Sequence, residues 1–272
     1  MILCADDFGL NNSVSTGILN LVHAKKSNSV SCLVTTSNWK KRVPELQLLC
    51  DSVELGLHLT LTDPKPVHFP GHSLSSLIRK SYLGQLKKQE IILEIQAQMK
   101  IFRETTGRLP DYVDGHEFCH HLPTVREALI EIAEEFHFKE NNIYIRVFRQ
   151  GKLPFFKNSI FWMFNHIISI PSKKLARLLK SRGILFNSCL FGFHPYHLEP
   201  KKYFEYYFQA KPSKKDIFFC HPGLLSDDNS DSLRHYRFQI YNFMMSSQFD
   251  DMLNHFQVNL SVPLYKHFND QI

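Results

Sequence analysis

Residues 4–9 read Cys4-Ala5-Asp6-Asp7-Phe8-Gly9, two adjacent carboxylates between a short apolar run and a glycine. The apolar residues 2–5 are typical of a buried strand, which places Asp6 and Asp7 at its carboxyl end, where α/β folds assemble their sites. Because neighbouring strand residues point to opposite faces, one carboxylate can bind a metal while the other faces a reacting water. A bare Asp-Asp pair is also common in loops, where one Asp caps the next helix. The choice between these interpretations depends on the rest of the chain.

The length and composition favour one globular domain. A chain of 272 residues with 43% hydrophobic and 21% charged residues is typical of a single α/β barrel. The first residues lack the charged, apolar and small segments of a signal peptide, so we expect a cytoplasmic protein. The six cysteines form no Cys-x-x-Cys pair, and we expect them to be small buried residues without disulfides.

The charge and hydropathy patterns argue against a nucleic-acid partner and against a membrane span. The net charge is +6, but the basic residues are spread in short clusters such as residues 40–42, so we do not expect a nucleic-acid partner. The aromatic run at residues 155–170 is interrupted by polar residues and is shorter than the ~20 residues that cross a bilayer. We therefore expect no transmembrane segment.

Predicted strands and helices alternate along the whole chain. We expect helices from a cap at residues 11–13 to residue 22, around Pro44 up to residue 50, and at 83–105, 124–136, 172–182, 201–209 and 232–246. We expect strands at residues 2–5, 30–35, 53–61, 111–114, 143–148, 184–191 and 217–220. No repeat or linker divides this series. The sequence therefore predicts an α/β fold in which residues 1–272 form a single domain, an irregular or incompletely closed (β/α) TIM-like barrel.

Four of the predicted strands have Asp or His side chains at or near their carboxyl ends. Parallel strands bring their carboxyl ends to one rim of the sheet, so these side chains should converge although they lie far apart in sequence. One carboxylate with two imidazoles would leave coordination positions open for water and substrate, which is typical of a catalytic metal site. The residues at these strand ends are Asp6, Asp7, His58, Asp114, His116 and His221.

A zinc-protease motif offers an alternative. Residues 116–120 read His-Glu-Phe-Cys-His, which matches the His-Glu-x-x-His pattern. That pattern requires a helix with both histidines on one face. Gly115 directly before it and Pro123 shortly after it are unfavourable to such a helix. We keep the protease as the less favoured reading.

Four stretches of the chain resemble one known family. The order and spacing of residues 5–9, 56–62, 114–123 and 220–223 are similar to those of the YdjC-like (ChbG/HpnK) carbohydrate deacetylases, with Phe118 where the middle histidine of that family usually stands. The resemblance implies a (β/α) barrel-like fold and a hydrolase that removes N-acetyl groups from an amino sugar or oligosaccharide with one divalent metal ion.

The resemblance also assigns roles to residues of this chain. It implies that Asp7, His58 and His116 bind the metal, that Asp6 is the catalytic base and that His221 is the general acid. Arg146 and His120 would contact the substrate.

Several points stay open on the sequence alone. Mixed Asp and His ligation suits Zn²⁺, while Mg²⁺ or Mn²⁺ can bind with more waters. A non-catalytic, metal-containing glycan-binding protein is a further alternative, and a metal-dependent phosphoesterase would usually need more carboxylates and a phosphate cradle. The acetylated sugar and the oligomeric state, including a homodimer, are not determined by the sequence.

Overall fold

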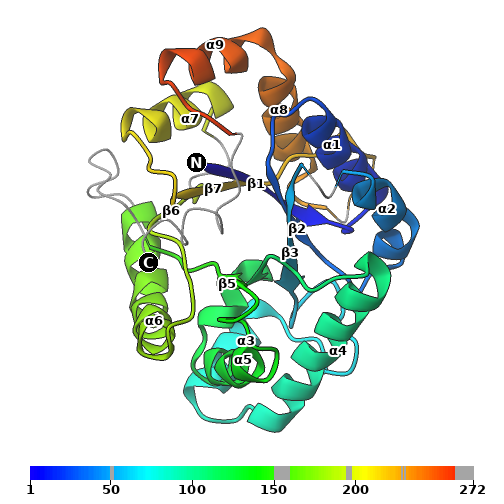
Figure 1. The fold of residues 1–272 in the computed structure, drawn as a ribbon, viewed down its shortest axis with the longest axis vertical. Helices are drawn as coiled ribbons and strands as arrows, with labels where there is room; N and C mark the ends of the chain where they lie inside the picture. The colour runs from blue at the N-terminus through cyan, green and yellow to red at the C-terminus, as the bar shows by residue number, and fades with distance from the viewer. Residues whose placement is uncertain (50–51, 150–159, 194–197, 228, 230, 261–272) are drawn as a thin grey trace.

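A computed structural model describes residues 1–49, 52–149, 160–193, 198–227, 229 and 231–260, without the side chains of residues 160–168. Seven parallel strands form one sheet in the order β5-β4-β3-β2-β1-β7-β6. Figure 1 shows the sheet in the centre of the molecule with the helices around it. The strands are β1 (Ile2–Phe8), β2 (Ser29–Cys32), β3 (Glu54–Leu59), β4 (Tyr112–Gly115), β5 (Tyr144–Ile145), β6 (Leu190–Phe191) and β7 (Ile217–Cys220).

The helices follow the strands in chain order. Among the described residues they are α1 (Asn12–His23), α2 (Ser37–Gln47), α3 (Leu74–Tyr82), α4 (Lys88–Thr106), α5 (Pro123–Glu135), α6 (Ile160–Arg182), α7 (Pro200–Gln209), α8 (Arg234–Met245) and α9 (Ser247–His255), with a 3₁₀ segment η1 (His116–His121). None of these helices combines the length and the apolar character that a membrane span needs.

The β5 and β6 edges of the sheet are joined by a few hydrogen bonds and not by a continuous strand pairing. Ile145 of β5 forms an isolated parallel bridge with Phe186, before β6. The side chain of Asn187 accepts a hydrogen bond from the backbone N–H of Val147 (2.7 Å) and donates one to its carbonyl (3.0 Å). The sheet is therefore an incompletely closed (β/α) barrel, which confirms the predicted fold class.

The strand registers place the polar strand ends at one rim. His58 of β3 lies opposite Asp114 of β4, and Ala5 of β1 lies opposite Cys220 of β7. His221, which follows β7, is therefore beside the Asp6-Asp7 pair of β1. All neighbouring pairs are parallel, so the carboxyl ends share one side of the sheet.

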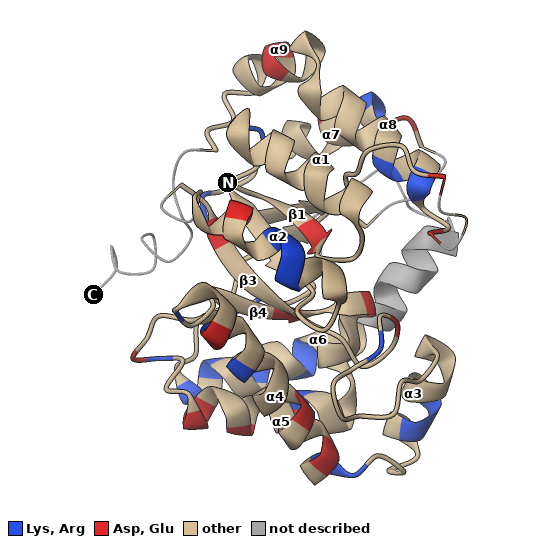
Figure 2. Cartoon of the chain, turned by 90° about the vertical axis from the view of Figure 1, so that its right-hand side faces the viewer, with Lys and Arg blue, Asp and Glu red and all other residues tan. Residues whose placement is uncertain are grey.

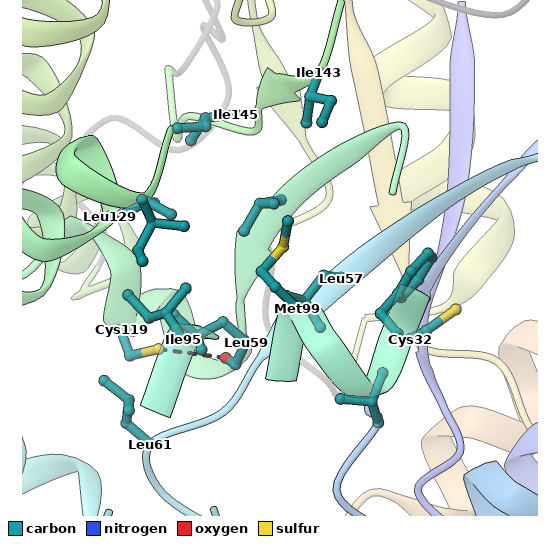
Figure 3. Close-up of a cluster of buried hydrophobic side chains, with 14 of the residues drawn as sticks. Cys32, Leu57, Leu59, Leu61, Ile95, Met99, Cys119, Leu129, Ile143 and Ile145 are labelled. Atoms are coloured by element: carbon teal, nitrogen blue, oxygen red, sulfur yellow. Dashed lines mark hydrogen bonds between the residues drawn. The ribbon is translucent and has the colours of Figure 1, made fainter. Parts of the chain in front are cut away.

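Apolar packing holds the helical layer on the sheet. Figure 3 shows Ile95 and Met99 of α4 against Leu57 and Leu59 of β3, and all four side chains are fully buried. Burial of each such side chain contributes roughly 1.5–3 kcal/mol, whereas the ion pair of Lys87 and Glu90 at the start of α4 is exposed and screened by solvent. Core packing, and not surface charge, therefore fixes α4.

The surface charges are mixed on the side that Figure 2 presents. Basic and acidic segments alternate there along α4 and α5. Mixed charge is typical of a solvated surface. The expected lack of a nucleic-acid partner stays a prediction.

The structure corrects several predicted elements. Residues 74–82 form α3, which a proline-rich stretch before it concealed, and residues 247–255 form α9 beyond the last expected helix. Helix α6 begins at residue 160 and continues through Pro171, so the expected start at residue 172 is wrong. The strands near residues 143–148 and 184–191 are shorter than expected because the chain there closes the barrel irregularly. The cysteines of the described residues are free, and Cys50 lies outside those residues.

Gly56 provides a test of the packing between β3 and β4. A Cβ atom at Gly56 would lie 2.1 Å from the ring of Tyr112. That ring is fully buried, stacks on Tyr144 at 5.0 Å and bonds through its hydroxyl to Ser29 Oγ at 3.0 Å, so it cannot move aside. We predict that Gly56→Ala lowers the free energy of unfolding by about 1–3 kcal/mol, the usual cost of overpacking.

Urea denaturation measures this effect, with Gly71→Ala as the control. The nearest atom to a Cβ at Gly71 is 3.5 Å away, so the control should be close to wild type. Equal stability of the two variants would contradict the packing described for Gly56.

Candidate active site

Strand β1 carries both neighbouring carboxylates into one cavity. The pairing of β1 with β2 shifts register between Ala5 and Phe8, and Asp7 has a φ of 74°. Such a bulge re-aims a side chain. Asp6 and Asp7 therefore both line the cavity, although neighbours in a regular strand point to opposite faces.

Three predicted ligand atoms lie close together. Asp7 Oδ1 is 3.4 Å from His58 Nε2 and 3.1 Å from His116 Nδ1, and the two histidine nitrogens are 3.3 Å apart. Ligands about 2.1 Å from one ion are separated by roughly 3.0–3.4 Å in octahedral or tetrahedral geometry. The triangle therefore has the size that one divalent ion requires.

The buried Asp7 carboxylate supports this fit. Asp7 Oδ1 has no hydrogen-bond partner among the described residues, while Oδ2 accepts a hydrogen bond from Arg237 Nη2 at 2.8 Å. Burial alone would raise the pKa of Asp7, but Arg237 and His116 hold that pKa well below its usual range. The carboxylate is thus ionised, oriented by Arg237 and left with one free oxygen, as a metal ligand should be.

Asp114 orients the first histidine. His58 Nδ1 lies 2.7 Å from Asp114 Oδ1, and Ser31 Oγ donates to the same oxygen at 2.7 Å. A carboxylate that accepts a hydrogen bond from Nδ1–H leaves the Nε2 lone pair for a metal. Burial disfavours the charged ring, but the neighbouring carboxylates, Asp114 first, outweigh burial and raise the pKa of His58 to about 10. A metal must therefore displace a proton from Nε2.

Asp6 and Asp114, which lie beside the triangle of Asp7, His58 and His116, are paired with the guanidinium of Arg146. Arg146 is 2% exposed, donates to both oxygens of Asp6 at 2.7 Å and also pairs with Asp114. Burial disfavours its charge, yet the two carboxylates keep the pKa of Arg146 well above its usual range. The guanidinium thus compensates part of the negative charge of the cluster of Asp6, His58 and Asp114. The predicted substrate contact of Arg146 stays a prediction, because its observed hydrogen bonds are to acids and sulfur.

The protease alternative is wrong in its geometry. Glu117 and Phe118 have φ values of 53° and 56°, so η1 is not an α-helix. His116 points to the Asp7 corner, whereas His120 is buried and its Nε2 lies 2.8 Å from the carbonyl of Arg146. The two histidines therefore cannot bind one ion as the protease motif requires. The substrate contact of His120 stays a prediction, and among the described residues His121, not His120, lines the cavity.

His221 lines the same cavity as the Asp6-Asp7 pair. Its ring meets the ring of Phe219 edge to face at 5.6 Å. Burial lowers the pKa of His221 to about 4, against the opposite effect of Asp7 and Asp6. The imidazole is therefore neutral at pH 7 and can accept a proton.

The cavity of about 830 Å³ is lined by more residues than the sequence indicated. Arg237 of α8 and its partner Asp231 (2.9 Å) are absent from the predicted site residues, because the sequence around them predicts a helix and not the end of a strand. An arginine at a core position between Tyr236 and Ile240 was the available signal. The apolar wall was also missed, and it comprises Leu10, Leu74, Ile78, Tyr82, Phe118, Leu122, Pro171, Phe193, Phe219 and Leu233.

These features describe a (β/α) barrel with three candidate metal-ligand residues, Asp7, His58 and His116, at the carboxyl ends of its strands. The chain belongs to the YdjC-like protein family, which it matches over residues 1–255. The predicted family is therefore confirmed.

Curated relatives and a solved structure add detail. The chain is 28% identical to a carbohydrate deacetylase of Xenopus laevis over 169 residues, covering 57% of this chain and 54% of that protein. It is 32% identical to the carbohydrate deacetylase of Mus musculus over 50% of this chain and 47% of that protein. It is 28% identical to the chitooligosaccharide deacetylase of Escherichia fergusonii over 56% and 60% of the two chains. The matched region thus spans about half the length of these curated relatives.

An Enterococcus faecalis crystal structure has the same fold. That protein, provisionally described as a cellobiose-phosphate cleavage protein, superposes with a TM-score of 0.71 at 17% identity and covers 98% of this chain and 97% of its own. At this identity the likeness concerns the fold alone.

The geometry predicts different roles for the two adjacent acids. Asp7 contributes the free oxygen of the triangle, whereas Asp6 is paired with Arg146. We predict that Asp7→Asn weakens Zn²⁺ binding by at least about tenfold, while Asp6→Asn keeps the affinity within a few-fold of wild type. Calorimetric titration of the metal-stripped proteins measures both values.

Asp63→Asn is the matched control, since Asp63 lines the cavity outside the ligand triangle. It reports the general effect of removing one negative charge. If Asp6→Asn loses as much affinity as Asp7→Asn, the proposed division of roles is wrong.

Proposed function

We propose that the protein is a metal-dependent carbohydrate deacetylase that hydrolyses the N-acetyl group of an amino sugar or oligosaccharide. The observation that carries the proposal is the ligand triangle of Asp7, His58 and His116, with edges of 3.1–3.4 Å, in one cavity with Asp6 and His221. The names of the matched relatives support the same reaction.

Asp7, His58 and His116 would hold the divalent ion. Two imidazoles and one carboxylate suit Zn²⁺ better than Mg²⁺, which prefers oxygen ligands, although Mg²⁺ remains an alternative. When bound, such an ion polarises a carbonyl and acidifies water. Arg237 keeps the Asp7 carboxylate in position for this role.

Asp6 would accept a proton from the attacking water. Arg146 fixes both Asp6 oxygens by two parallel hydrogen bonds, and each oxygen retains a second lone pair for a proton. A base that is held in one orientation keeps the geometry that proton transfer requires. The pairing with Arg146 therefore orients the Asp6 carboxylate and also compensates its charge.

His221 would protonate the sugar nitrogen as the C–N bond breaks. Because its imidazole is neutral at pH 7, it must first take up a proton. Asp6 would pass on to it the proton accepted from the water, which returns Asp6 to its ionised form. The overall balance is one water consumed and one acetate and one protonated amine formed, because both protons of the water end on the amine nitrogen. Proton transfer of this kind is worth about 10²–10⁴ in rate.

Acetate release tests the proposal. We expect the wild-type protein, loaded with Zn²⁺ or Mg²⁺, to release acetate from at least one member of a panel of N-acetylated mono- and oligosaccharides. The metal-stripped protein should release no acetate, and elemental analysis verifies that its metal has been removed. Sugar binding without any acetate release by the metal-loaded protein would contradict the proposal and favour a glycan-binding protein.

Replacement of His221 tests its role as the acid. We predict that His221→Ala lowers kcat on the amide by about 10²–10⁴ with little change in metal content. The loss should be much smaller on 4-nitrophenyl acetate, whose leaving group needs no proton. Steady-state kinetics on both substrates measure the difference.

His235→Ala is the control, since His235 is an exposed histidine of α8. Equal losses of kcat on the amide and on the ester would show that His221 has a structural role. A cytoplasmic location and a homodimer stay predictions.

A further inference from the structure

His121 is a cavity histidine that the proposed mechanism does not use. It follows the strained part of η1, lines the cavity and is 1% exposed. Helix α3 packs against η1, and Ile78 and Tyr82 of α3 line the same cavity. His121 thus lies on the part of the wall that η1 and α3 form.

One hydrogen bond fixes the tautomer of His121. The backbone N–H of Phe148 donates to His121 Nε2 at 3.2 Å, so Nε2 carries no proton. Burial, assisted by His120, Arg146 and Arg126, lowers the pKa of His121 well below its usual range. A neutral imidazole that accepts at Nε2 must carry its proton on Nδ1.

This Nδ1–H group is itself buried and has no acceptor among the described residues, so an acceptor has to reach it from the cavity that His121 lines. The ring cannot turn to find one, because it stacks on Phe118 at 5.7 Å and packs on His120 at 4.0 Å. The backbone carbonyl of His121 is also fixed, since it accepts a hydrogen bond from Arg126 Nη1 at 3.1 Å. A buried donor without an acceptor is unfavourable and is usually satisfied by water or a ligand.

We infer that His121 donates a hydrogen bond from Nδ1 to an oxygen of the sugar substrate, either a hydroxyl or the acetamido carbonyl. This inference rests on the proposed function and adds a substrate-binding residue to it. Phe118 and Tyr82 offer apolar faces in the same cavity, which suits a sugar ring with one polar anchor.

Two isosteric variants separate the two ring nitrogens. In His121→Gln the side-chain oxygen can still accept from Phe148, but the donor at the δ position is lost. In His121→Asn the amide nitrogen occupies the δ position and keeps the donor. We expect His121→Gln to lower kcat/KM on N-acetylchitooligosaccharides by about tenfold to a hundredfold, mainly through KM, and His121→Asn to stay within a few-fold of wild type.

The rate on 4-nitrophenyl acetate identifies the sugar oxygen. An unchanged rate in His121→Gln supports a contact with a hydroxyl, since the ester has no sugar. A rate that falls together with the sugar reaction supports a contact with the acetyl carbonyl. Metal content close to wild type is expected in both variants. Urea stability should be close to wild type in His121→Gln and lower in His121→Asn, in which the buried N–H of Phe148 loses its acceptor.

The inference and the proposed function can fail separately. If the wild type releases acetate and His121→Gln keeps its kcat/KM on the sugar, the inference is overturned and the function stands. If the wild type releases no acetate, the function is overturned, and ¹⁵N spectroscopy of the wild-type histidines decides the inference. A proton on His121 Nδ1 whose signal shifts with added N-acetylchitooligosaccharide supports it, and a proton on Nε2 or no shift overturns it.

Discussion

The buried guanidinium of Arg146 is the contact on which the rest of the site depends. It joins Asp6 of β1 to Asp114 of β4, two carboxylates that would otherwise repel each other in a medium of low dielectric. Removal of one partner from such a buried group typically costs about 3–5 kcal/mol. With its charge balanced, Asp114 can orient His58 through Nδ1. The guanidinium therefore stabilises the fold and, through Asp114, sets the orientation of His58, a predicted metal ligand.

Backbone strain in two places completes this arrangement. Asp7 and Glu117 both have left-handed φ values, which cost about 1–3 kcal/mol each and persist only where surrounding contacts hold them. Arg237 holds the Asp7 side chain, and the irregular turn of η1 lets His116 face Asp7 while His120 stays buried under Arg146. Strain at these residues therefore accompanies the close approach of Asp7, His58 and His116, the three predicted ligands.

The residues at the rim of the barrel could be predicted from the sequence, because parallel strands bring their carboxyl ends to one side of the sheet. The strand ends predicted that Asp7, His58 and His116 converge with the other polar strand ends, while their selection as a ligand set followed from the family resemblance. The structure places these three side chains together, although their metal-binding role stays a prediction. Arg237 could not be assigned in this way, since its contact with Asp7 depends on how α8 packs more than 200 residues later in the chain. The same limit applies to Arg146, whose place near the site followed from family resemblance but whose pairing with both Asp6 and Asp114 requires tertiary structure. The bulge in β1 and the cavity wall from α3 left no periodic signal in the sequence.

The most direct measurement is anomalous diffraction from a crystal of the protein soaked in Zn²⁺. The account predicts one strong anomalous peak within about 2.0–2.2 Å of Asp7 Oδ1, His58 Nε2 and His116 Nδ1. Arg146 should remain between Asp6 and Asp114 in the same crystal. A peak bound by Asp6 and Asp114 with Arg146 displaced, or no peak in the cavity at saturating Zn²⁺, would contradict the account.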